Sequence, residues 1–105
     1  MVWNGAGEAT MTEILMVRIY LSESHAHLSK LLDLLHAEVR GVTVLRGISG
    51  FGKSGKIHNT HLVDLSFDLP LIVEFFDSPE KVQQVLKILP VAPDHVVQWT
   101  AHLND

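Results

Sequence analysis

The sequence predicts a single α+β domain with the element order β-α-β-β-α-β, the ferredoxin-like split βαβ arrangement. Two strand-like segments, near 13–20 and 69–76, are each followed by apolar residues at the i, i+3, i+4, i+7 spacing of a helix. The chain therefore reads as two similar halves. In this topology both helices lie on one face of an antiparallel sheet, with the first and third strands at its centre.

In the first half, alternation over 13–20 separates two sets of side chains, as expected for a strand. One face carries Leu15, Val17 and Ile19, and the other carries Met16, Arg18 and Tyr20. A helix follows, and we expect Gly41 to stop it. Its apolar stripe consists of Leu28, Leu31, Leu32 and Leu35. The β-branched segment 42–46 is the second predicted strand.

The second half begins with a third strand over about 69–76, apolar on both faces except for Glu74. The next helix is expected to use Ser78 as N-cap and Pro79 as its first residue. Its stripe is Val82, Val85, Leu86 and Leu89, and we expect Pro90 and Pro93 to end it. Alternation over 95–103 predicts the last strand.

The sheet face away from the helices is predicted to be apolar. Its candidate residues are Met16, Tyr20, Ile72, Phe76 and Trp99. Because large exposed apolar patches usually mark interfaces, we expect the protein to oligomerise through this face.

Composition narrows the class of protein. We expect residues 1–12 to form a loose tail and 13–105 to form one domain, because 105 residues that are 47% hydrophobic suffice for one core. The net charge of −4 argues against a nucleic-acid-binding protein. Cysteine is absent, no apolar run is long enough to span a membrane and no secretory signal is recognisable, so we expect a cytoplasmic protein.

The most informative segment is 41–56, a β-branched strand that runs into a loop rich in glycine and lysine. Backbone N–H groups in such a loop can bind an anion, and a nearby lysine adds charge. Residues 47–54 match the P-loop pattern G-x-x-x-x-G-K-[ST], but the following residues have poor helix propensity and the chain is too short for such a fold. The other interpretation from the residues alone is a flexible hairpin tip. The connection 47–68 is long enough to suggest a functional loop.

The stretches GVTV at 41–44 and GFGK at 50–53 resemble the second strand and the start of the T-loop in PII signalling proteins. A fuller resemblance, over about 15–89, is to a PII-like family of uncharacterised proteins, domain of unknown function family 190. It implies a homotrimer that binds AMP, ADP or ATP in clefts between subunits. It also implies that the T-loop docks on a partner protein, such as a membrane transporter. The nucleotide-binding residues implied are Arg46, Gly50, Phe51, Gly52 and Lys53.

The sequence departs from the PII pattern in two other phosphate-contacting elements. Segment 89–95 has neither the glycines nor the lysine of the PII motif T-G-x-x-G-[DE]-G-K. The last strand offers Gln98, Trp99 and His102 in place of the C-terminal R-x-R. The only tyrosine is Tyr20, so the T-loop tyrosine that is modified in PII proteins is also missing. These departures are compatible with nucleotide binding that is weaker, that is selective for AMP or ADP, or that is lost.

Seven histidines keep a metal-binding alternative open, with pairs at 25/27 and 58/61. Neither pair has the companion carboxylates or thiolates of a defined site, so we assign no metal ligand. CutA proteins, PII-like trimers linked to metal tolerance, would be the model for that alternative. We expect no catalytic activity and no required cofactor. Among the carboxylates Glu74 is the exception, because it lies in an otherwise apolar strand. The third alternative is a trimeric interaction protein without a small ligand.

Overall fold

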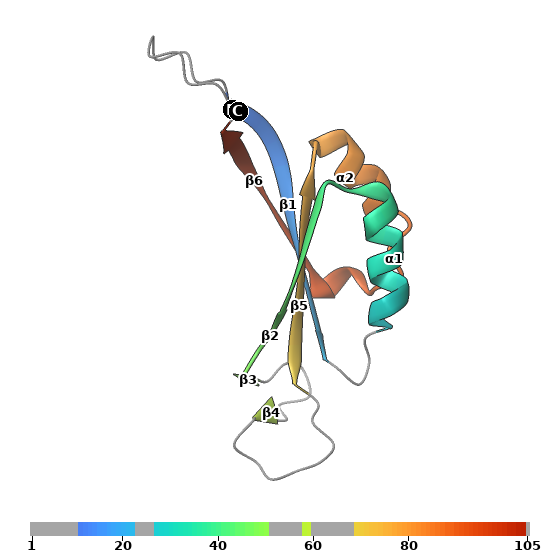
Figure 1. Ribbon diagram of the computed structural model, residues 1–105, viewed down its shortest axis with the longest axis vertical. Helices are drawn as coiled ribbons and strands as arrows, with labels where there is room; N and C mark the ends of the chain where they lie inside the picture. Colours follow the sequence, from blue (N-terminus) through green and yellow to red (C-terminus); the bar gives the residue numbers. More distant parts are fainter. Residues whose placement is uncertain (1–10, 23–26, 51–57, 60–68, 105) are drawn as a thin grey trace.

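The computed structural model describes residues 11–22, 27–50, 58–59 and 69–104 (Figure 1). Their elements follow the predicted order, with a short hairpin added between the second and third predicted strands. The elements are β1 (Met11–Ser22), α1 (Leu28–Glu38), β2 (Gly41–Arg46), β3 (Ser49–Gly50), β4 (His58–Asn59), β5 (Pro70–Asp77), α2 (Pro79–Leu86), the 3₁₀ helix η2 (Pro93–His95) and β6 (Val96–Asn104).

The main sheet has the strand order β2-β5-β1-β6, and every neighbouring pair is antiparallel. The first and third predicted strands, β1 and β5, are central, as the ferredoxin-like topology requires. The register places Met16 between Phe76 on β5 and Trp99 on β6. It places Tyr20 opposite Ile72. The five residues predicted for the open face therefore do share one face.

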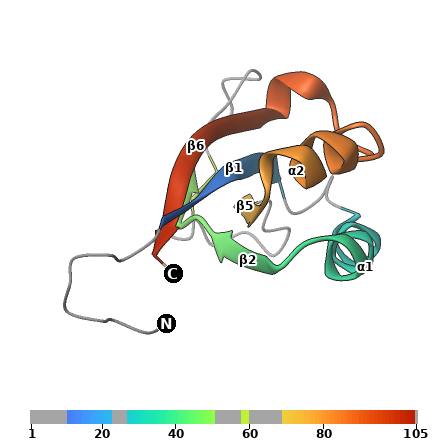
Figure 2. The same cartoon turned by 90° about the horizontal axis from the view of Figure 1, so that it is seen from above.

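Both helices lie on the other face of the sheet, as the view from above shows (Figure 2). The core between the layers is made of alternate strand residues and the predicted helical stripes. Its fully buried members include Val17, Ile19, Val73 and Phe75 from the sheet, Leu35 from α1, and Val82 and Val85 from α2. An ion pair of 2.6 Å between Lys81 Nζ and Glu38 Oε2 joins the two helices, and both side chains are partly exposed.

The two helices start differently. Ser78 is the N-cap of α2, where its Oγ accepts a hydrogen bond of 3.3 Å from the backbone N–H of Lys81, and Pro79 opens the helix. This confirms the predicted start. The N-cap position of α1 is His27, whose side chain makes no capping hydrogen bond.

Three predicted boundaries are wrong. Gly41 does not stop α1, which ends at Glu38, but is the first residue of β2. A side chain at Gly41 would have its Cβ 3.0 Å from the Phe76 ring, so close packing explains this glycine. Helix α2 ends at Leu86, before Pro90, and β1 begins at Met11, inside the segment expected to be tail.

Candidate functional site

The base of the long loop after β2 is held by the start of β5. The backbone N–H of Gly47 donates a hydrogen bond of 2.7 Å to the carbonyl oxygen of Pro70. Strands β3 and β4 then pair antiparallel, with Ser49 opposite Asn59 and Gly50 opposite His58. In Figure 1 this hairpin lies beyond the ends of β2 and β5, away from the chain termini.

Two glycines of the motif pack against the ring of Pro70. A Cβ atom on Gly47 would lie 2.6 Å from Pro70 Cγ, which no side chain tolerates without displacement. The corresponding distance at Gly50 is 3.3 Å. Close approach of two chain segments is a common reason for glycine. At Gly47 this packing accounts for the residue without any ligand, and a partner 23 positions away could not be read from the local sequence.

Of the five predicted binding residues, Arg46 and Gly50 lie in the described part of the chain. Arg46 ends β2 opposite Leu71, and Gly50 ends β3. Phe51, Gly52 and Lys53 lie outside the described residues. The structure therefore locates the base of the predicted phosphate loop and leaves its tip as a prediction.

The structure also argues against the P-loop interpretation of residues 47–54. Strand β5, which ends with the acidic residue Asp77, runs antiparallel to β2. Residues 58–59, just past the motif, form a strand. Asp77 at the end of β5 has a structural role: its Oδ2 accepts the Arg40 N–H at 3.0 Å, and its Oδ1 accepts the Ser78 N–H at 2.7 Å.

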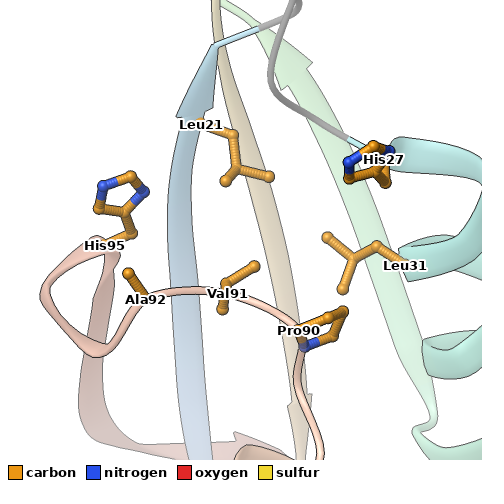
Figure 3. Close-up of a pocket in the computed structure, with 7 residues that line it drawn as sticks. All are labelled: Leu21, His27, Leu31, Pro90, Val91, Ala92 and His95. Carbon is orange, nitrogen blue, oxygen red and sulfur yellow. The ribbon is translucent and has the colours of Figure 1, made fainter.

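A cavity of about 160 Å³ opens near the same end of the sheet (Figure 3). His27 and His95 stand on opposite sides of it, Leu21 and Val91 lie between them, and Leu31 is on the same side as His27. The full lining is Leu21, His27, Leu31, Pro90, Val91, Ala92 and His95. Leu21 is opposite Leu71, which is in turn opposite Arg46, so one row across three strands connects the cavity wall with the end of β2.

The chemistry of this cavity differs from that of a phosphate site. Its walls are mainly apolar, and neither lysine nor arginine is among the described residues that line it. Segment 89–95, which lacks the glycines and the lysine of the PII motif, supplies four of the seven lining residues. Such walls suit a flat or apolar group better than an anion. Sequence reasoning missed the cavity, because His27 and His95 are 68 positions apart and nothing local predicts that they share it.

The structure offers no metal site within its described ranges, where no group of three or more histidine, cysteine or acidic residues is close enough to hold an ion. His25 and His61, one member of each predicted pair, lie outside these ranges. Nor does any helix in the described part of the chain have the length and apolarity to cross a membrane.

The open face of the sheet carries one ion pair at its centre. Arg18 donates from Nε at 3.0 Å and from Nη2 at 2.6 Å, in both cases to Oε2 of Glu74. The Glu74 carboxylate, followed by Tyr20, raises the pKa of Arg18 above its ordinary value. The Arg18 guanidinium also lies over the Trp99 ring, 5.4 Å from its centroid. Glu74, the one carboxylate of an otherwise apolar strand, is thus the ion-pair partner of Arg18.

Residues 14–100 match the profile of the family described as "Uncharacterized ACR", domain of unknown function family 190. The chain belongs to this family. Two proteins of Aquifex aeolicus (strain VF5), both called UPF0166 protein, are similar to it. One is 38% identical over 77 residues, which are 73% of this chain and 79% of the relative. The other is 33% identical over 78 residues, which are 69% and 74% of the two chains.

Solved structures of PII-like proteins share the fold of this family 190 member. CPII, a nitrogen regulatory PII-like protein from Thiomonas intermedia K12 bound to ADP, AMP and bicarbonate, matches with a TM-score of 0.71. The match is 22% identical and covers 92% of this chain and 93% of CPII. A putative PII-like signaling protein from Thermus thermophilus matches with a TM-score of 0.58 and 14% identity, covering 89% of each chain. The ferredoxin-like, PII-like fold predicted from the sequence is confirmed.

Proposed function

We propose that this protein is a PII-like regulatory protein of the cytoplasm that binds an adenine nucleotide in the clefts between subunits of a homotrimer. The nucleotide changes the order of the loop after β2, and that loop modulates a partner protein or a membrane transporter. The observation that carries the proposal is the fold shared with CPII, a protein that was solved with ADP and AMP. A ligand shifts such a loop only by its difference in affinity for the ordered and disordered states.

Two features of this chain support the location of the site. The end of β2, the Gly50 hairpin and the apolar cavity all lie toward one end of the sheet. The cavity offers the apolar walls that a base needs, whereas the loop offers backbone N–H groups and a lysine for phosphate. In the proposed complex Gly50, Phe51 and Gly52 approach the phosphates, and Lys53 and Arg46 contribute positive charge.

The apolar cavity wall formed by segment 89–95 bears on which nucleotide is preferred. Since this segment has neither glycine nor lysine, it lacks the phosphate-binding groups of the PII motif. We therefore expect AMP and ADP to bind more tightly than ATP. Each charge-assisted hydrogen bond contributes about 1.5–3 kcal/mol, so one missing contact is enough to set this order.

The test is calorimetric titration of the assembled protein with AMP, ADP and ATP. Lys53→Ala should weaken binding about ten- to hundredfold, because one charge-assisted contact to phosphate is lost. Gly52→Val should block the approach of the ligand. Lys56→Ala, a loop lysine outside the motif, is the matched control and should change affinity much less.

Two results would count against the proposal. Unchanged nucleotide affinity in Lys53→Ala, with assembly and thermal stability also unchanged, means that the phosphate assignment is wrong. If no nucleotide, cyclic AMP included, gives a heat of binding, the proposal that the protein binds an adenine nucleotide is wrong. In that case titration with zinc and copper tests the metal-responsive alternative. If neither metal binds, the result favours an interaction protein without a small ligand.

A further inference from the structure

The open face of the main sheet presents an ion pair within an apolar surface. Arg18 and Glu74 face each other across β1 and β5, the two central strands. One neighbouring row consists of Phe76, Met16 and Trp99, and the other contains Leu45, Ile72 and Tyr20. Leu45, Tyr20 and Trp99 are 47%, 45% and 38% exposed, although they are large and hydrophobic. Such a surface favours association, but its charged centre restricts what can cover it.

The geometry of the pair leaves part of it available to a second molecule. Both hydrogen bonds from Arg18 use the same carboxylate oxygen, Oε2, which leaves Oε1 outside the pair. A guanidinium has five N–H donors, and the pair uses two of them. The Arg18 and Glu74 side chains remain 34% and 24% exposed, so both are reachable from solvent.

Covering this face with a purely apolar surface would be costly, because the charges would lose water without gaining a partner. A strongly acidic or basic partner would satisfy only one of the two signs. A second copy of the same face offers both a guanidinium and a carboxylate, next to an apolar surface of matching character. The face can therefore pair with two other copies, with its arginine toward one neighbour and its glutamate toward the other.

We propose that Arg18 of one copy donates to Glu74 of the next, so that the pair determines the register and specificity of self-association. This inference rests on the proposed assembly and adds the residues that select it. The apolar rows supply the driving force, whereas the charges penalise every arrangement that buries one of them alone. A head-to-tail contact of this kind closes into a ring when the rotation between copies permits it.

The experiment uses two reversal variants and measures their masses by native mass spectrometry and light scattering. Arg18→Glu gives a face with two acidic residues, and Glu74→Arg gives a face with two basic residues. Each variant alone should repel itself, and the concentration needed for assembly should rise at least about tenfold. Mixing the two variants should partly restore complexes that contain both chains, because two of the three contacts in a mixed trimer then join opposite charges and only one joins like charges.

The ion pair between Glu38 and Lys81 is a matched control. It has the same N–O distance of 2.6 Å and similar exposure, 36% for Lys81 and 34% for Glu38, but it joins the helices on the other side of the molecule. Glu38→Lys and Lys81→Glu should assemble like the wild type. If they lose assembly as the reversal variants do, the effect is one of stability or net charge, and the inference is wrong.

The remaining outcomes separate the inference from the assembly on which it rests. A wild-type protein that is monomeric at micromolar concentration overturns both. Wild-type assembly with reversal variants that assemble equally well overturns only the role of the pair. Reversal variants that do not assemble alone and are not rescued by mixing show that the pair acts within one chain, which also overturns the inference.

If circular dichroism shows that a reversal variant is unfolded, Glu74→Gln replaces it as the test. Glu74→Gln should weaken assembly about tenfold, and unchanged assembly contradicts the inference.

Discussion

The two faces of the main sheet are built from the same strands, but one face is covered by the helices and the other is open. On β1, Val17 and Ile19 are completely buried under the helices, whereas Tyr20, the next residue along the chain, is 45% exposed. Alternation along a strand places neighbours on opposite faces, so one segment of sequence serves both purposes. The side chains of the helix-covered face are buried within one chain. The open face is apolar, and no element among the described residues covers it.

Under the proposed assembly, folding and association of copies depend on separate sets of residues. Substitutions on the covered face should lower the free energy of unfolding of each chain. Substitutions on the open face should leave that free energy nearly unchanged and weaken the association of copies. The predictions below test this separation, and any substitution that affects both properties equally would break it.

The largest effect is expected from Phe75→Ala. Phe75 is 1% exposed at the centre of the core, and its removal leaves a cavity between β5 and the helices. We expect a loss of about 3–5 kcal/mol in the free energy of unfolding, measured by denaturant titration. A loss below about 1 kcal/mol would show that the covered face is not the main source of stability.

Trp99→Ala should act mainly on assembly. Trp99 is 38% exposed and lies against the Arg18 guanidinium, so its removal takes apolar area from the open face and frees Arg18. A central aromatic residue of an interface contributes about 2 kcal/mol or more, which corresponds to a roughly thirtyfold weaker association. Sedimentation at several protein concentrations measures this. Thermal unfolding of the separated chain is the control and should shift far less than in Phe75→Ala.

Gly47→Ala tests the sheet end, which belongs to neither face. The new Cβ would lie 2.6 Å from Pro70 Cγ, so the hairpin base or β5 has to move. We expect a destabilisation of about 1–3 kcal/mol by denaturant titration. Gly50→Ala is the matched control with more space, 3.3 Å, and should cost less.

A second substitution shows whether the Pro70 ring causes the effect. Pro70→Ala removes the clashing Cγ atom, so the double variant Gly47→Ala/Pro70→Ala should recover much of the loss caused by Gly47→Ala alone. Strictly additive losses in the double variant would mean that the contact with Pro70 does not explain this glycine.

The sequence predicted the elements well because their signals are local. Periods of two and 3.6 identified the covered face, and the Ser78–Pro79 pair identified the start of α2. Gly41 was misread as a helix stop because its close neighbour, Phe76, is distant in the sequence. The partner of Glu74 and the cavity between His27 and His95 were missed for the same reason. At the proposed binding site the family motif predicted Arg46 and Gly50, but only the structure shows that this glycine faces Pro70.

The smallest effect is expected from Ser78→Ala, which removes the N-cap of α2. The Ser78 hydroxyl accepts the Lys81 N–H, and loss of such a cap costs about 1 kcal/mol. Ser29, exposed in the first turn of α1, is the control, since Ser29→Ala removes no N-cap. Denaturant titration should therefore separate the two variants, while light scattering should show wild-type assembly for both. Because α2 packs on the covered face, a change in assembly with Ser78→Ala would show that the two faces are coupled through the sheet, and the separation of folding from assembly would have to be abandoned.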